Sequence, residues 1–256
     1  MQASESKKNK IAALYPLTKF YIAVVMAVLA LLLPGFVSKI GIFILINILA
    51  ACSGVWGIFA KRVRNSVGIL FIILLLIQLF FYPNESDILF TFWIFSAKKE
   101  GLFFALRLGF TLLCVGGALI WYFAVTTERD FVLTLEKKGL SSKASYVILS
   151  TLQMVPVMKK RSQVIMNAQR ARGVETEGNF ITRAKVFIPT LVPLVLSSIQ
   201  GMEERALTLE ARGFSIETKA THLYDIFETP LDRKVVLLMH AVLVIGIAGR
   251  IALWLI

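Results

Sequence analysis

The 256-residue chain has few of the side chains that bind metals, with only two cysteines and two histidines. Cys52 and Cys114 both lie inside apolar runs, where a cysteine is usually a small packed residue, so we expect neither a disulfide nor a metal pair. His222 and His240 have no metal-ligand spacing and no paired acid. The sequence therefore predicts no metal site and no cofactor.

The chain also lacks the residues of an ATPase, and its apolar runs hold few ionisable or polar side chains. No Gly-x-x-x-x-Gly-Lys-Ser/Thr loop is present to cradle a nucleotide. An intramembrane enzyme needs ionisable residues in the bilayer, and a stand-alone permease needs a convergent polar lining, whereas Asn47, Gln78 and Thr111 are isolated. We therefore expect a non-catalytic protein, with a permease or an intramembrane enzyme as the weaker alternatives.

Apolar residues dominate what is present: 57% of the chain is hydrophobic and the mean hydropathy is +0.75. Such a composition is typical of a multi-span membrane protein. Five apolar runs are each close to the roughly 20 residues that cross the hydrocarbon core. Their approximate bounds are 20–37, 40–59, 67–82, 102–125 and 235–256. The sequence predicts an all-α membrane protein with about five transmembrane helices.

Positive charge is in excess, with a formal net charge of +12, and its distribution predicts the orientation. Lysine and arginine gather in the cytoplasmic loops of membrane proteins. The predicted loop with Lys61, Arg62 and Arg64 and the stretch 126–234 are rich in them, whereas one alternate loop has only Lys39. We therefore expect the N-terminus and residues 126–234 in the cytoplasm. The sequence has no basic patch with interleaved aromatics, so we do not expect a nucleic-acid partner.

The sequence divides into three parts. Residues 1–125 hold an N-terminal tail and four transmembrane helices, residues 126–234 form a cytoplasmic domain, and residues 235–256 are the last transmembrane helix. In the cytoplasmic domain, Thr127–Asp130 resembles a capping box and predicts a short helix that ends at Gly139.

Two longer helices are predicted to follow in the same domain. Ser141 or Ser142 can cap the first helix, which continues to Arg172. The second includes the apolar stretch 186–199, which is too short to cross a membrane, and ends at Arg212. Small residues on the apolar stripes predict that these helices cross closely. The small residues are Ala168, Ser198 and Ala206.

The two long helices end in the same tripeptide, Ala171-Arg172-Gly173 and Ala211-Arg212-Gly213. A glycine after a helix adopts the left-handed conformation that ends it, and an arginine in the last turn suits the helix dipole. A guanidinium at such a rigid end can form a bidentate pair with a carboxylate of a partner. One copy would be ordinary helix punctuation, but two copies in one domain favour a binding function.

The two tripeptides carry a resemblance to a known family. Residues 151–173 and 189–214 resemble the two coupling segments of the transmembrane T component (EcfT) of energy-coupling factor transporters, a cobalt-permease Q-like family. Tyr15 stands where that family has an acidic residue, and no proline follows Thr127. Further residues match the family's pattern: Pro16, Thr18, Lys19, Thr126, Thr127, Pro156, Pro189 and Pro193.

The resemblance implies a subunit that joins two ABC-type ATPase subunits to a small substrate-binding membrane subunit, the S component. Its place would be the cytoplasmic membrane of a bacterium or archaeon. Arg172 and Arg212 are each expected to dock on one ATPase, while the neighbouring alanines and glycines allow close approach and end the helices. ATP-driven movement would then power uptake of a vitamin or transition-metal ion that the S component holds.

Four methionines in the long helices are candidates for contact with the S component, because methionine offers a soft surface that can repack. Simple packing between helices is an equally open interpretation. These residues are Met154, Met158, Met166 and Met202.

Overall fold

The computed structural model describes residues 11, 13–81, 88–92, 95–174, 179–216, 224 and 226–255, with the backbone alone for 88–92, 95–98, 180–186 and 253–255. The chain forms two compact units, Met1–Thr134 with Ile226–Ile256, and Leu135–Asp225. The domain boundaries predicted from the sequence, 125/126 and 234/235, were drawn at the ends of apolar runs and not from contacts. They stay predictions.

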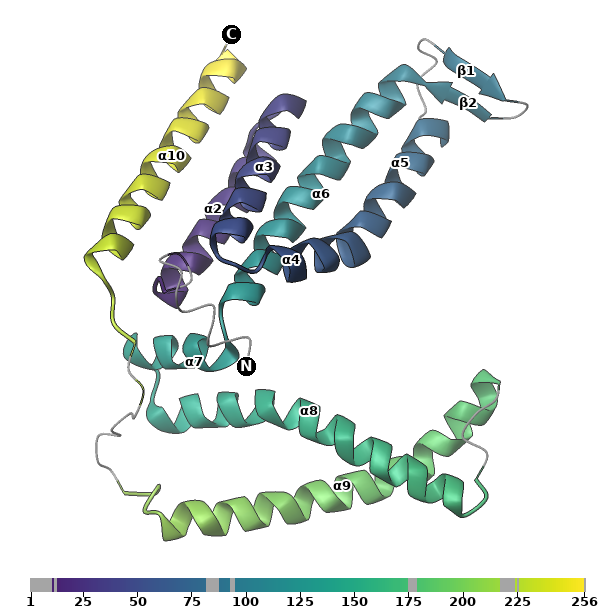
Figure 1. Cartoon of the computed structure of the whole chain (residues 1–256), viewed down its shortest axis with the longest axis vertical. Helices are drawn as coiled ribbons and strands as arrows, with labels where there is room; N and C mark the ends of the chain where they lie inside the picture. The colour runs from purple at the N-terminus through teal and green to yellow at the C-terminus, as the bar shows by residue number, and fades with distance from the viewer. Residues whose placement is uncertain are drawn as a thin grey trace. The chain divides into compact units, whose positions relative to one another are not determined.

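The first unit is a helical bundle with a short hairpin (Figure 1). Helix α6 contacts α2, α3, α4 and α5, and α10 packs against α2, so α6 is the central helix of the bundle. The elements are α2 (Pro16–Leu32), α3 (Phe36–Cys52), α4 (Trp56–Val63), the π-helical turn η2 (Arg64–Gly68), α5 (Ile69–Phe81), β1 (Ile88–Phe92), β2 (Phe95–Lys98), α6 (Lys99–Val125), α7 (Glu128–Lys137, which continues into the second unit) and α10 (Pro230–Leu255).

Five apolar helices agree with the prediction of a multi-span membrane protein. Trp56–Phe81, Lys99–Val125 and Pro230–Ala252 are long and apolar enough to cross a membrane, and Pro16–Leu32 and Phe36–Cys52 are shorter apolar helices. The all-α fold class is confirmed, with one addition within the described residues. Strands β1 and β2 form a short antiparallel hairpin, which the sequence analysis does not predict.

The boundary between the second and third apolar helices differs from the prediction. The chain turns at Gly54, which has a φ of +72°. Helix α4 starts soon afterwards, at Trp56, and runs through the π-helical turn into α5 as one apolar helix. Lys61, Arg62 and Arg64 therefore lie in a helix and not in a loop, because the left-handed glycine ends α3 well before the charged residues.

Lys39 and Cys52 also differ from the sequence-based expectation. Lys39 is not in a loop but buried in α3, and its Nζ donates hydrogen bonds to the carbonyl oxygen of Arg107 and to Oγ1 of Thr111, both on α6. A long lysine stem can carry the ammonium to such partners, and a buried charge requires them. Cys114 is buried as expected, but Cys52 is exposed, so the prediction that both cysteines are packed inside is wrong for Cys52.

Small residues on α6 allow close packing of the preceding helix. A Cβ added at Gly109 would lie 2.4 Å from Cδ2 of Phe71, and a Cβ at Gly116 would lie 2.7 Å from Cγ2 of Val67. Both distances are shorter than van der Waals contact, so a larger residue at either position forces its neighbour to move. Glycine lets helices approach closely in a membrane, where packing drives their association.

We expect Gly109→Val to destabilise the first unit by about 1–3 kcal/mol, because the added carbons overpack the contact with Phe71. Gly41→Val is the matched control, since Gly41 is an exposed helical glycine with nothing within 4 Å of the Cβ position. Thermal unfolding of the full chain in detergent measures the difference. Equal unfolding midpoints for the two variants would contradict this packing.

The short helix α7 and the start of the next helix form as predicted. The N–H of Asp130 donates to Oγ1 of Thr127 at 3.2 Å, which caps α7, and Gly139 ends this region with a φ of +116°. Of the two candidate caps for the following helix, Ser141 takes the role, because its Oγ accepts the N–H of Ala144 at 3.3 Å.

The second unit is dominated by two long helices, α8 (Ser142–Ala171) and α9 (Phe180–Ala211), which cross each other (Figure 1). Both continue through their internal prolines, so the stretch 186–199 is part of one helix. The prediction of a crossed pair is confirmed. Of the residues predicted to allow the crossing, Ser198 is half-buried, but Ala168 and Ala206 are exposed, so the prediction is wrong for the two alanines.

Candidate functional site

Helix α8 ends in a regular left-handed glycine stop. Gly173 has a φ of +83°, which a residue with a Cβ adopts only with strain. Its N–H donates to the carbonyl oxygen of Arg170 at 2.9 Å, and the N–H of Val174 donates to that of Gln169 at 3.1 Å. This pair of bonds is the Schellman motif, in which the chain satisfies the last carbonyls of the helix and leaves the axis sharply.

Helix α9 ends in the same way. Gly213 has a φ of +73°, and its N–H donates to the carbonyl oxygen of Glu210 at 2.9 Å. The N–H of Phe214 donates to the carbonyl oxygen of Leu209 at 3.0 Å. The tripeptides Ala171–Gly173 and Ala211–Gly213, which we call the helix tips, therefore share one backbone geometry.

The glycine stop alone does not distinguish the tips. After α7, Gly139 has a positive φ as well, and the N–H groups of Gly139 and Leu140 donate to the carbonyl oxygens of Glu136 and Leu135. No Ala-Arg pair precedes Gly139, where the residues are lysines. What sets the helix tips apart is the arginine held next to a small alanine at the end of a long helix.

The arginines of both tips point into open space. Ala171, Arg172 and Gly173 are exposed, as are Ala211 and Arg212, and only Gly213 is half-buried. Within the part of the chain that the structure describes, neither guanidinium has a hydrogen bond or an ion pair. Each tip therefore presents an unused planar donor group, which suits the carboxylates of a partner.

A family model described as the cobalt transport protein CbiQ matches residues 7–223, a range that includes both helix tips. The chain belongs to this family. Membership in a transport family, together with the apolar helices, makes the chain a membrane protein. The resemblance to T components of energy-coupling factor transporters is thereby confirmed.

Relatives in this family carry a more specific name, "Energy-coupling factor transporter transmembrane protein EcfT". The protein of Thermotoga maritima is 28% identical over 191 residues, which cover 70% of this chain and 68% of the relative. The protein of Lactococcus lactis subsp. cremoris is 27% identical over 169 residues, or 61% of each chain. The protein of Clostridium kluyveri is 31% identical over 182 residues, which cover 67% of this chain and 66% of the relative. The matches thus span 61% to 68% of these relatives' lengths.

The four candidate methionines of this CbiQ-family chain differ in exposure. Met202 on α9 is 56% exposed and Met158 on α8 is 37% exposed, whereas Met154 and Met166 are half-buried. Met158 and Met202 are accessible to a partner, and the other two are partly covered. Their contact with a second membrane subunit stays a prediction.

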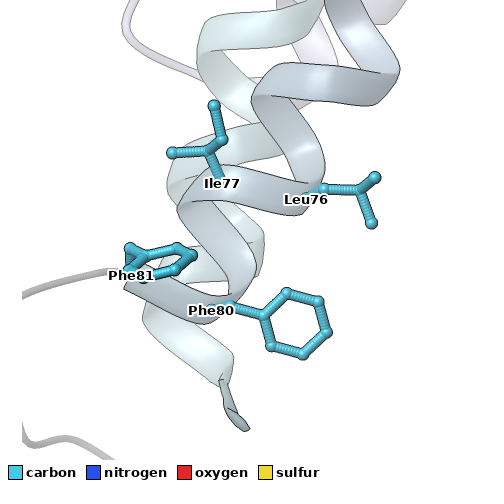
Figure 2. Close-up of a pocket in the computed structure, with 4 residues that line it drawn as sticks. All are labelled: Leu76, Ile77, Phe80 and Phe81. Atoms are coloured by element: carbon cyan, nitrogen blue, oxygen red, sulfur yellow. The ribbon is translucent and has the colours of Figure 1, made fainter.

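A hollow on α5 is lined by apolar side chains and offers no polar group to a substrate. Leu76, Ile77, Phe80 and Phe81 line a shallow hollow on this single helix (Figure 2). Among the described residues, no group of three or more His, Cys, Asp or Glu side chains could hold a metal ion. His222 lies outside the described residues, and His240 Nδ1 lies 2.7 Å from the hydroxyl of Tyr21.

A buried carboxylate that was not predicted, Asp232, lies in the first turn of α10. One of its oxygens accepts the N–H of Tyr15 at 2.8 Å, and the other accepts the N–H of Thr229 at 2.7 Å. The start of α2 thus meets a carboxylate from α10. The spacing of Thr229 and Asp232 is that of a capping box with aspartate in the acidic position, a signal that was available in the sequence.

Lys19 belongs to the same group of charged residues. It is buried in the first turn of α2 and interacts electrostatically with Asp130 and Asp232. The starts of α2 and α10 and the first turn of α7 are thus joined by charged groups. Lys19 therefore has a structural role that its sequence pattern alone does not reveal.

Proposed function

We propose that this CbiQ-family protein is the energy-coupling transmembrane subunit of an energy-coupling factor importer. It passes ATP-driven motion from two ABC-type ATPase subunits to a small substrate-binding S component. Its own role is mechanical, and ATP hydrolysis takes place in the partner subunits. The names of its relatives support this role.

The observation that carries the proposal is the pair of helix tips with one geometry. Arg172 and Arg212 follow helices of about 45 and 48 Å, at a rise of 1.5 Å per residue, and each lies next to a left-handed glycine. Rigid ends that present exposed guanidinium groups suit carboxylate-lined grooves on two copies of one kind of partner. A protein with a single partner would need one such end.

The proposed orientation places α8, α9 and the N-terminus in the cytoplasm, where ATP is available. The excess of lysine and arginine in residues 126–234 supports it. The cargo is a vitamin or a transition-metal ion held by the S component, and the description of the family as a cobalt transport protein favours the metal ion.

The experiment is affinity purification of the full tagged chain from the membranes of its own host in mild detergent. We expect ABC-type ATPase subunits and a small integral membrane protein to co-purify, and mass spectrometry identifies them. A membrane protein without relation to ATPases, made from the same promoter and carrying the same tag, is the control. Recovery of the chain without any ATPase would overturn the proposed function.

A further inference from the structure

Helices α8 and α9 cross (Figure 1), and Arg161 forms a hydrogen bond from one helix to the other. Nη1 of Arg161, on α8, donates a hydrogen bond to the backbone carbonyl oxygen of Ser197, on α9, at 2.7 Å. The two residues are 36 positions apart, and Arg161 is half-buried. Arg161 lies on the apolar stripe of α8, and its guanidinium donates this hydrogen bond to the neighbouring helix.

On α9, the guanidinium of Arg161 lies against Gly201, which we call its seat. A Cβ added at Gly201 would lie 3.3 Å from both Nη1 and Nη2 of Arg161, tighter than nine in ten real Cβ contacts. Glycine in the middle of a helix is unfavourable relative to alanine, and Gly201 lies inside α9. The flat guanidinium lying against it gives a physical reason for a glycine at this position.

The two helices also meet through an aromatic pair and apolar faces. The ring of Tyr146, near the start of α8, lies 5.0 Å from the ring of Phe214, just after α9. The half-buried residues around Arg161 on α8 include Val157 and Ile165, and Leu194 on α9 is half-buried as well. Apolar contact is non-directional, so such faces can slide along one another. A hydrogen bond holds only over a narrow range of distance and angle. The bond from Arg161 to Ser197 therefore constrains the register at the crossing more narrowly than the apolar faces do.

The crossing lies at a distance from both helix tips. Along the helix axes, Arg161 is about 16 Å from Arg172 and Ser197 is about 22 Å from Arg212, at 1.5 Å per residue. With the crossing fixed, moving one tip changes the position of the other helix. Without this bond, the helices can slide along each other, and a movement of one tip no longer moves the other helix.

We propose that Arg161 is a positioning residue that pins the crossing of α8 and α9, with Gly201 as its seat, so that the two helix tips move as one unit. This inference rests on the proposed function. It adds that coupling between the two ATPase-docking ends depends on a bond remote from both.

The test measures the distance between α8 and α9 by double electron–electron resonance in the full chain. Spin labels are placed at Asn167 and Leu207, both exposed, after Cys52→Ser removes the exposed thiol. We expect one narrow distance distribution in the parent chain and a broad one in Arg161→Met. Arg161→Lys keeps a donor for the Ser197 carbonyl and should restore part of the narrow distribution.

Further variants distinguish loss of the contact at the crossing from general unfolding. Gly201→Leu raises helix propensity but fills the seat, so it should broaden the distribution without unfolding α9. Gln200→Leu and Lys160→Met, at exposed neighbouring positions, are the matched controls and should leave it narrow. A narrow, unshifted distribution in both Arg161→Met and Gly201→Leu would overturn the proposal.

The same variants distinguish this proposal from the proposed function. Arg161→Met keeps both helix tips, so we expect it to retain the ATPase subunits in a pull-down while ATP no longer shifts the label distance. An ATP-dependent shift of parental size in Arg161→Met would overturn the positioning role. Absence of ATPases from the parent chain would instead count against the proposed function, and the broadening measured without ATP would still decide whether Arg161 pins the crossing.

Discussion

Replacing both Arg172 and Arg212 with alanine should abolish stable association with the ATPase subunits, whereas each single replacement weakens it. Hydrogen bonds to charged groups contribute about 1.5–3 kcal/mol, and the tips are exposed before binding. Each arginine is therefore expected to account for about 10- to 100-fold in affinity, at about 1.4 kcal/mol per factor of ten. The two losses multiply when each tip binds its own ATPase, so the double variant suffers far more than either single one.

A quantitative pull-down of the ATPase subunits from detergent extracts checks this expectation. Arg172→Lys and Arg212→Lys keep the charge but not the planar fork, and should bind with intermediate strength. Lys159→Ala on α8 and Glu204→Ala on α9 are exposed controls away from the tips and should bind as the parent does. Unchanged recovery of ATPases by the double arginine variant would show that the tips do not dock.

Asp232→Ala should destabilise the first unit by about 3–5 kcal/mol, because it removes one partner from a buried charged cluster. The N–H groups of Tyr15 and Thr229 and the hydroxyl of Thr229 all lose their acceptor. Lys19 keeps Asp130 as a charged neighbour but loses the other carboxylate. The hydrogen bonds that join the starts of α2 and α10 are then lost, and we expect the bundle to open first at this end.

Unfolding of the detergent-solubilised chain can be followed with a thiol-reactive dye, since Cys114 is fully buried and Cys52→Ser removes the exposed thiol. Arg233→Ala, at an exposed position in the same turn of α10, is the control and should react at the parent temperature. Dye labelling of Asp232→Ala at that same temperature would mean that the carboxylate contributes little to stability.

The parts of the fold set by local sequence were predictable. A helix cap needs only residues three or four positions apart, and a glycine stop needs only the glycine and the turn before it. Thr127, Gly139 and the two helix tips therefore follow from the sequence. The apolar helices follow from composition, because about 20 apolar residues are what a bilayer requires.

The parts that depend on contacts between distant residues were not predictable. Lys39 reaches α6, and Asp232 reaches the start of α2, over separations that no periodicity encodes. At the crossing of α8 and α9, the sequence favours the alanines, whereas Arg161 against Gly201 makes the contact. Small size alone does not reveal which face of a helix is covered, since that depends on the partner's register.

Photo-crosslinking from the helix tips tests the central claim most directly. A benzophenone amino acid is placed at Ala171 or Ala211 in the full chain in the membranes of its own host, and at Val37, which is 79% exposed at the start of α3, as control. We predict that both tip positions crosslink to an ABC-type ATPase subunit and that Val37 does not. Tips that crosslink only to lipid would contradict the account.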